Sequence, residues 1–477
     1  MADFDTVIRN GRVATASDVF DCDIGIKDGK VAALSKELTD AAQVVDASGK
    51  FVLPGGIDAH VHLDEPPFFK ALLNDNFETG TIAAAHGGTT TIMSFAQQEK
   101  GRTLRASLQD YHQKAEGKAV IDYSFHIILT DPNEQVVGQE MPALIEDGYT
   151  SYKCFMAYDG ALNDGQILST MDTAKRHGAL VMIHAENEHC IHHLCGKILD
   201  EGNTSLDHFP QIAPMAVERE ATHRAITLSE IKDVPILLVH VSAREAMDQI
   251  RWGQERGLKI YGETCPQYLF LTDEVYRKEG WEAAKYICSP PPRDRDNPDA
   301  LWRGIANGVF QVVSSDHNAF QFEGEVGKKI SGHSKPHFRK VPPGIPGIEP
   351  RLALMFSEGV NGNRIDINTF VAVTATNPAK IYGLYPRKGT IAVGSDADIA
   401  IWDPNKKVTI SHEVLHEDVD FTPYEGIEVV GWPMTVFSRG QLLVADGEFV
   451  GATGGGEFLR CDRVNLNPPR GNRVCDS

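Results

Sequence analysis

Histidines at the end of an apolar run are the first residues of this sequence that could do chemistry. The run 57–63 contains His60 and His62 two positions apart. Residues i and i+2 of a β-strand point to the same side, so these two imidazoles could bind one metal ion. A solitary pair of this kind is more often packed in a core, so further ligands are needed before it indicates a metal site.

Three more candidate ligands stand at the ends of other apolar runs. They are His184, His240 and Asp316. Imidazole and carboxylate groups suit Zn²⁺, with Mn, Fe, Co or Ni as alternatives. Ligands placed in this way are hard to explain by packing, and together they exceed the needs of one tetrahedral ion. The sequence therefore predicts a site for two metal ions.

Lys153, within the run 151–156, is a candidate for the anion that two neighbouring cations need between them. An ammonium group facing a barrel mouth would be costly to bury. Burial lowers the pKa of a lysine and favours the neutral amine. A neutral amine can take up CO₂ to form a carbamate, which is a bidentate anion. Without the histidines, a lysine reaching the barrel rim or forming a Schiff base would be the preferred interpretation.

The apolar runs also indicate how these side chains are positioned. Stretches with helical periodicity, such as 222–231 and 244–256, separate most of the runs. The alternation predicts an α/β fold, a (β/α)8 TIM-like barrel over residues 56–384, with an open doubly wound sheet as the alternative. Reactive side chains of a parallel barrel gather at the C-terminal ends of its strands, where the candidates stand. The runs are 57–63, 89–95, 121–129, 151–156, 180–185, 236–241, 260–264 and 309–314.

Turn signals near both ends of the chain predict a smaller β domain. Asn10-Gly11 and Asp28-Gly29 stand between apolar runs near the N-terminus, and Asp446-Gly447 does so near the C-terminus. Such pairs are typical of β-hairpins. We expect a small β-sandwich domain formed by residues 1–55 and 385–450, with the barrel inserted between its halves. Residues 451–477 predict an extended tail that could lie on another subunit.

Composition excludes several classes of protein. The 477 residues are 42% apolar and 23% charged, which is ordinary globular usage. A net charge of −20 argues against nucleic-acid binding. No apolar run approaches the ~20 residues that span a bilayer. The 8 cysteines are dispersed without a CxxC pair, and the N-terminus lacks a signal-like segment, so the sequence predicts a cytoplasmic protein.

In order and placement, these candidate ligands resemble those of the amidohydrolase superfamily. The segment 152–158, Tyr-Lys-Cys-Phe-Met-Ala-Tyr, resembles the dihydropyrimidinase/hydantoinase branch of its cyclic amidohydrolases, as do Ser289-Pro290-Pro291, 344–349 and 377–384. The resemblance runs from about residue 5 to residue 450. It implies two Zn²⁺ ions per subunit, a CO₂-derived carbamate on Lys153 (N6-carboxylysine) and commonly a homotetramer.

The same resemblance assigns roles to individual residues. It implies that His60, His62 and Asp316 bind the more buried metal ion, that His184 and His240 bind the more exposed one, and that Lys153 bridges the two. A hydroxide between the metals would be the nucleophile, and Asp316 would move its proton to the leaving nitrogen.

Two further residues would contact the substrate. Tyr158 would donate to the oxyanion of the intermediate, and packing of this tyrosine on the barrel rim is the alternative. Ser289 would contact the cyclic amide through its backbone.

The implied reaction is the opening of a C–N amide bond in a cyclic amide or imide. Suitable substrates are 5,6-dihydropyrimidines or 5-substituted hydantoins, which give N-carbamoyl amino acids. An allantoinase or a related imidase is the alternative enzyme. A non-catalytic scaffold similar to the collapsin response mediators is the alternative outside enzymology, although those proteins lack the metal ligands that this sequence retains.

This sequence departs from the family pattern near the expected substrate. Asp64 stands where many relatives carry an arginine for a substrate carboxylate, which argues against an anionic substrate. Pro343 replaces a usual asparagine, and Asn318 replaces a usual cysteine. Phe68 and Phe69 follow the first two ligands, and we expect them to receive the ring substituent or else to pack on the barrel wall or a neighbouring subunit.

Overall fold

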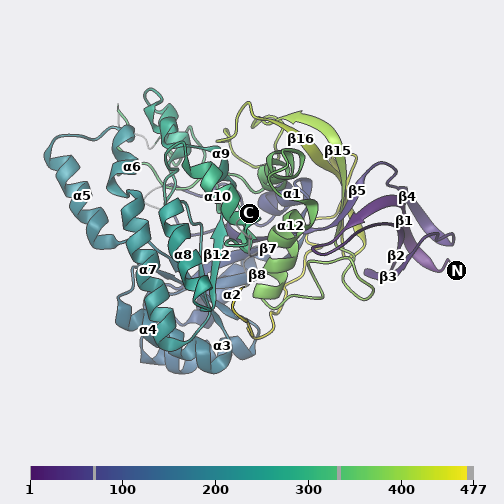
Figure 1. Cartoon of the computed structure of the whole chain (residues 1–477), viewed down its shortest axis with the longest axis horizontal. Coiled ribbons are helices and arrows are strands. Elements are labelled where there is room, and N and C mark those ends of the chain that lie inside the picture. The colour runs from purple at the N-terminus through teal and green to yellow at the C-terminus, as the bar shows by residue number, and fades with distance from the viewer. Residues whose placement is uncertain (1, 68–70, 330–334, 470–477) are drawn as a thin grey trace.

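The computed structural model describes residues 2–67, 71–329 and 335–469. Figure 1 shows two parts, a barrel surrounded by helices and a β-sheet beside it that carries the N-terminus. The prediction of a TIM-like barrel with a β domain built from both termini is confirmed. Within the described ranges, no helix has the length and apolarity needed to cross a membrane.

The barrel is a parallel sheet with strand order β13-β12-β11-β10-β9-β8-β7-β6-β14. Its interior is filled by apolar side chains such as Met93, Phe95, Met182 and Leu237, which alternate along the strands with residues facing the helices. The strands are β6 (Gly56–His62), β7 (Thr89–Gln97), β8 (Asp122–Ile128), β9 (Ser151–Phe155), β10 (Leu180–His184), β11 (Ile236–Leu238), β12 (Ile260–Thr264), β13 (Val312–Val313) and β14 (His317–Asn318).

The last barrel strand differs from the expected run 309–314. It is split into β13, which pairs with β12, and β14, which pairs with β6, so the two short segments together close the barrel. Ser315 lies between them and donates its backbone N–H to Asp58 Oδ1 at 3.0 Å. The next residue, Asp316, has φ 52°. The change of partner therefore interrupts the strand at the residue expected to bind metal.

Helices cover the outside of the barrel (Figure 1). The longer ones follow the predicted alternation, and α4 begins at a capping box formed by Asn163 and Gln166. The α-helices are α1 (Thr79–His86), α2 (Leu104–Ala115), α3 (Met141–Glu146), α4 (Asp164–His177), α5 (Glu188–Asp200), α6 (Phe209–Ile212), α7 (Met215–Lys232), α8 (Arg244–Glu255), α9 (Pro266–Phe270), α10 (Asn297–Ala306), α11 (Pro350–Leu354), α12 (Ile367–Val371) and α13 (Asn377–Ile381). Shorter or π-helical turns are η1 (Val136–Glu140), η2 (Leu206–His208), η3 (Asp273–Arg277), η4 (Glu282–Tyr286), η5 (Met355–Asn361) and η6 (Ala372–Thr376).

The second sheet joins the two ends of the chain. The antiparallel pairing of β15 with β5, with Ile401 opposite Val52, connects the C-terminal strands to the N-terminal ones. The sheet consists of β1 (Phe4–Ala14), β2 (Val19–Lys27), β3 (Lys30–Ser35), β4 (Ala41–Asp46), β5 (Phe51–Pro54), β15 (Ile399–Thr409), β16 (Glu428–Ser438), β17 (Gln441–Ala445) and β18 (Glu448–Phe449).

Two of the three predicted hairpins are present, and the third is wrong. Asp28-Gly29 joins β2 to β3, and Asp446-Gly447 joins β17 to β18. Asn10-Gly11 instead lies inside β1, where the register with β2 shifts. Asn10 has φ 62°, its side chain donates to Asp46 Oδ1 at 2.9 Å, and β1 changes its parallel partner from β4 to β5 here. The pair therefore forms a bulge, and the long strand β1 pairs with β4 before it and with β5 after it.

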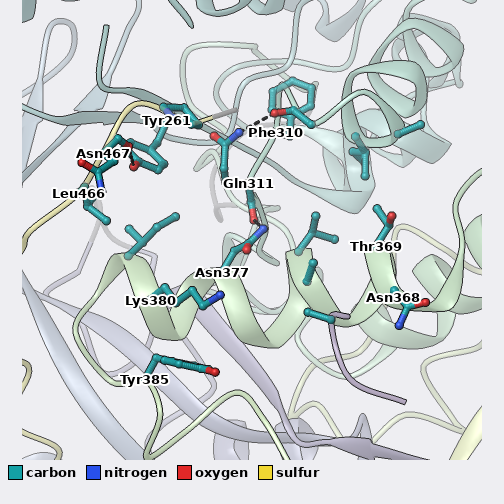
Figure 2. Close-up of a pocket in the computed structure, with 18 of the residues that line it drawn as sticks. Tyr261, Phe310, Gln311, Asn368, Thr369, Asn377, Lys380, Tyr385, Leu466 and Asn467 are labelled. Carbon is teal, nitrogen blue, oxygen red and sulfur yellow. Dashed lines mark hydrogen bonds between the residues drawn. The ribbon is translucent and has the colours of Figure 1, made fainter. Parts of the chain in front are cut away.

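The tail lies on its own barrel as far as the structure describes it. Backbone N–H groups of Leu459, Cys461 and Val464 donate to carbonyls of Tyr123, Gly148 and Gly178 at 2.7, 3.0 and 2.8 Å. These carbonyls lie near the N-terminal ends of barrel strands, so the tail covers the end opposite the candidate site. A cavity of about 760 Å³ lies at this end. Figure 2 shows Leu466 and Asn467 on one side of it and Asn377 and Lys380 on the other.

Candidate metal centre

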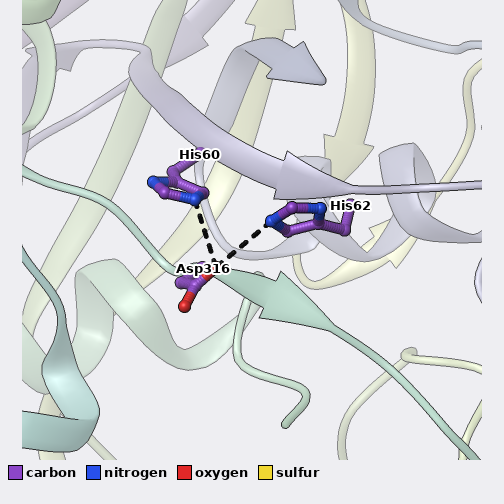
Figure 3. Close-up of side chains that lie close together, drawn as sticks. All are labelled: His60, His62 and Asp316. Atoms are coloured by element: carbon purple, nitrogen blue, oxygen red, sulfur yellow. Dashed lines mark ion pairs between the residues drawn. The ribbon is translucent and has the colours of Figure 1, made fainter. Parts of the chain in front are cut away.

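Three of the predicted ligands converge at the C-terminal end of β6 (Figure 3). His60 and His62 are two positions apart on β6, so both side chains point to the same side. Asp316 Oδ1 lies 3.2 Å from His60 Nε2 and 3.4 Å from His62 Nε2. The three ligand atoms lie within 4.8 Å of one another. They are therefore close enough to hold one ion.

Carboxylates fix the orientation of both imidazoles. Glu263 Oε1 lies 2.7 Å from His60 Nδ1, and Glu65 Oε1 lies 2.6 Å from His62 Nδ1. A carboxylate on Nδ1 keeps the proton there and leaves the Nε2 lone pair free, which is the usual support of a metal-binding histidine. The Nε2 atoms are the ones that face Asp316, so the donor set fits a metal ion.

The second pair of predicted histidines is also in contact. His184 Nδ1 lies 2.9 Å from His240 Nε2, and His184 Nε2 lies 2.8 Å from Glu186 Oε2. His240 Nδ1 is buried without a hydrogen-bond partner among the described residues. The rings of His60 and His240 are 5.3 Å apart, which brings the two pairs into one cluster.

Lys153 lies between these pairs on β9. Its Nζ is 2.9 Å from His60 Nε2 and 4.2 Å from the centre of the Phe95 ring. Burial lowers the pKa of Lys153, although Asp316 and Glu263 act in the opposite direction. The amine is thus placed where a bridging ligand would be needed, in surroundings that favour its neutral form.

Burial and neighbouring charge oppose each other at Asp316 and His62. Burial alone would raise the pKa of Asp316, but His60 and His62 lower it to about 2. Burial would lower the pKa of His62, but Glu65 and Asp316 raise it to about 9. The pKa of His60 lies well below its usual value because of burial and Lys153. A bound cation would favour the neutral form of both imidazoles and the charged form of the carboxylate.

A cavity of about 350 Å³ opens above the cluster and includes the predicted substrate contacts. Tyr158 and Ser289 line it together with Lys153 and Asp316. Tyr158 has φ 68°, and its hydroxyl donates to Glu186 Oε2 at 2.9 Å. The same oxygen contacts His184, so Glu186 connects the tyrosine to a candidate ligand.

The residues that depart from the family pattern differ in whether they line the cavity. Asp64 Oδ2 accepts the backbone N–H of Phe77 at 3.1 Å, and this residue is not part of the cavity wall. Pro343 and Asn318 do line the cavity. Phe68 and Phe69 lie outside the described residues.

The sequence analysis did not identify three carboxylates that contact the candidate ligands. Glu263 is next to last in the run 260–264, so its position at a strand end was a usable signal. Glu186 and Glu65 follow His184 and His62 by two and three residues, but nothing local shows that each accepts from a particular ring nitrogen.

Comparison with known proteins assigns nearly the whole chain to one family. A profile described as the amidohydrolase family matches residues 51–443. This chain belongs to the amidohydrolase family. A D-hydantoinase of Geobacillus stearothermophilus is 43% identical to it over 458 residues, 95% of this chain and 96% of that one. A D-hydantoinase of Streptomyces coelicolor is 44% identical over 461 residues, 95% and 97% of the two chains.

Solved structures agree with this placement. The crystal structure of a dihydropyrimidinase from Brevibacillus agri matches this amidohydrolase with a TM-score of 0.93 and 44% identity, over 97% of this chain and 99% of that one. The family resemblance expected from the ligands is therefore confirmed over nearly the whole chain. Unlike the non-catalytic scaffolds considered above, this amidohydrolase retains all the ligand-type side chains.

Proposed function

We propose that this amidohydrolase opens the C–N amide bond of cyclic amides, namely 5-substituted hydantoins or 5,6-dihydropyrimidines, to give N-carbamoyl amino acids. The observation that carries the proposal is the convergence of His60, His62, His184, His240 and Asp316 around Lys153 beneath a substrate-sized cavity. Near-complete matches to proteins named as D-hydantoinases support this substrate class.

The donor set suits two Zn²⁺ ions. His60, His62 and Asp316 would hold one ion, His184 and His240 the other, and a carbamate on Lys153 would contact both. When bound, the ions would polarise the scissile carbonyl and lower the pKa of the attacking water. Carbamate formation joins the Lys153 nitrogen to CO₂ and releases one proton, which the low pKa of the buried amine favours.

The remaining steps belong to side chains of the cavity. Asp316 would accept the proton of the attacking water and deliver it to the leaving nitrogen. Tyr158 would turn its hydroxyl from Glu186 to the developing oxyanion. Ser289 would hold the ring amide. The absence of an arginine at position 64 supports an uncharged ring substrate.

We further propose that the enzyme is a cytoplasmic homotetramer that acts on a small molecule without nucleic-acid or membrane partners. Light scattering on the purified chain would measure the assembly, and a monomeric mass would contradict this part of the proposal.

A substrate panel tests the main proposal. Purified protein is analysed for metal and assayed by ultraviolet absorbance on dihydrouracil, hydantoin, phenylhydantoin and allantoin. We expect about two zinc ions per chain and turnover of the first three compounds. Turnover of allantoin alone would favour the allantoinase alternative, and a metal-free protein inactive on all four compounds would contradict the proposal.

A further inference from the structure

Asn318 lies in the cavity wall beside a predicted metal ligand. It belongs to β14, and the pairing of β14 with β6 sets Asn318 opposite His62. Side chains at paired positions of neighbouring strands point to the same side of a sheet. Asn318 therefore faces the barrel mouth, as His62 does, and both residues line the cavity of about 350 Å³.

The carboxamide of Asn318 forms no hydrogen bond within the described part of the chain. Its Oδ1 is buried without a partner, whereas its backbone N–H donates to the Ile345 carbonyl at 3.0 Å. A carboxamide offers two donors and an acceptor, and leaving such a group unpaired in a cavity wall is unfavourable. The open side of Asn318 is the cavity, so a ligand there can accept a hydrogen bond from the amide nitrogen.

Gly344 holds this side chain at the edge of the cavity. A Cβ on Gly344 would lie only 2.7 Å from Cγ of Asn318. Gly344 has φ 147°, and its N–H donates to the Ile287 carbonyl at 2.9 Å, so its backbone is fixed. The carboxamide therefore packs against a rigid backbone segment.

The wall on either side of Asn318 is apolar. Phe320 lies two residues further along the chain and is bridged to Leu73, and Pro343 precedes Gly344. An apolar substituent would pack well on these side chains but would leave the carboxamide unpaired. A substituent with a hydrogen-bonding group would satisfy it.

We propose that Asn318 is a specificity-determining residue that hydrogen-bonds a polar substituent on the ring substrate. The ligand class is a hydantoin whose 5-substituent carries an amide, ureido or hydroxyl group. The inference rests on the proposed function and names the substrate class more closely. The cysteine expected at this position is only a weak hydrogen-bonding group. A site built to hydrogen-bond a substrate group discriminates strongly against the analogue that lacks it.

A matched pair of substrates tests this inference. The zinc-loaded full chain is assayed on 5-(carbamoylmethyl)hydantoin and on 5-isobutylhydantoin, which have similar size and differ in hydrogen bonding. We expect the ratio of their kcat/KM values to fall roughly tenfold in Asn318→Leu, because the polar substituent loses its partner. Gln97→Leu is the matched control. Gln97 also presents a carboxamide to this cavity but is exposed to water, so its replacement should leave the ratio nearly unchanged.

Asn318→Ala, which removes the carboxamide without adding bulk, should lower the ratio as well and serves if Asn318→Leu fails to fold. A ratio equal to that of the wild type in the folded variants overturns the inference, and so does an equal fall in Gln97→Leu. Hydrolysis of unsubstituted hydantoin by the wild type would leave the proposed function standing in those cases. A wild type that opens none of the three compounds overturns both.

Discussion

At the scale of single residues, the state of Lys153 matters most to the site. Its amine lies 2.9 Å from His60 Nε2, where a bare ammonium would repel a metal ion. We expect Lys153→Ala to lose both metal ions and hydrolytic activity, because the bridging anion is gone, and short carboxylic acids to restore part of each. Metal analysis and turnover with and without added propionate would measure this. A variant that keeps two zinc ions and full turnover would show that no bridge is needed.

Removal of the Tyr158 hydroxyl should lower the catalytic rate without affecting the fold. Its hydroxyl donates to Glu186 rather than to a candidate metal ligand, so its removal should leave the ligands in place. We expect Tyr158→Phe to retain zinc and fold while kcat falls by ~10²–10³, as for the loss of one oxyanion donor. If kcat stays near that of the wild type, the tyrosine is a packing residue.

Lys328 gives a pH dependence that is independent of the metal site. Burial lowers the pKa of Lys328 from 10.5 to about 7, and its amine donates to the carbonyls of Ala284 and Ile287 at 3.0 Å. Between these two pH values the unfolded chain holds one proton more than the folded chain, so the stability contributed by Lys328 rises with pH across this window and is lower and constant below it.

We therefore expect the free energy of unfolding of the wild type, relative to Lys328→Met, to rise by up to about 5 kcal/mol between pH 7 and pH 10.5. Denaturant unfolding at several pH values would measure the difference. Lys329, whose amine pairs with the exposed Glu323, provides the control, and Lys329→Met should show little of this slope. Parallel curves for wild type and Lys328→Met would contradict the prediction.

At the scale of elements, the ends of β6, β7 and β13 are held by one buried arginine. Arg351 on α11 places Nε 3.2 Å from Asp58 Oδ2 on β6 and donates to the Val313 carbonyl at 2.9 Å and to Thr89 Oγ1 at 3.0 Å. Asp58 in turn accepts from Ser315, next to Asp316. The arginine thus supports the segments that carry His60 and Asp316.

We expect Arg351→Met to lower the free energy of unfolding by ~3–5 kcal/mol, because the Asp58 carboxylate would be buried without its partner. Zinc content should fall with it, because the ligand-bearing segments lose their support. Chemical denaturation and metal analysis would measure both effects. Arg364, which pairs with the exposed Asp299 and Glu358, is the control, and Arg364→Met should cost no more than about 1 kcal/mol. Equal losses in the two variants would contradict the prediction.

At the scale of the whole molecule, one buried lysine connects the barrel to the second sheet. Lys388 Nζ lies 2.6 Å from Asp122 Oδ2 at the start of β8, and 2.6 and 3.0 Å from Asp398 and Asp396, which precede β15. This ammonium therefore pairs with three carboxylates from both parts of the chain. Asp122 also pairs with Arg439, and Asp396 also pairs with Lys30.

We expect Lys388→Met to be destabilised by at least ~3 kcal/mol, because the buried Asp398 would lose its counter-charge and two further buried carboxylates would each keep only one of two cations. The barrel and the second sheet should also unfold less cooperatively, which calorimetry would show as a broadened or divided transition. Lys407→Met, which removes only an exposed pair with Glu428, should unfold like the wild type. A single sharp transition at the wild-type temperature in Lys388→Met would disprove the connecting role.

The sequence by itself determined the barrel and the identity of the candidate ligands. His60, His62, Lys153, His184 and His240 each stand in or at the end of an apolar run, and both signals are local because strand periodicity and side-chain chemistry act within a few residues. Only the tertiary structure decided which groups support them. Glu263 on β12 contacts His60 on β6 from 203 positions away in the chain, and Glu186 is recognisable only once Tyr158 lies against it.

The break in the last strand and the bulge at Asn10-Gly11 were likewise decided by tertiary structure. Asp316 turns out of the strand because Ser315 bonds to Asp58, 257 positions away in the chain, and β1 bends at Asn10 because two different strands pair with it. Hydrogen-bond partners distant in sequence set these backbone angles, and no local pattern records which partner will be present.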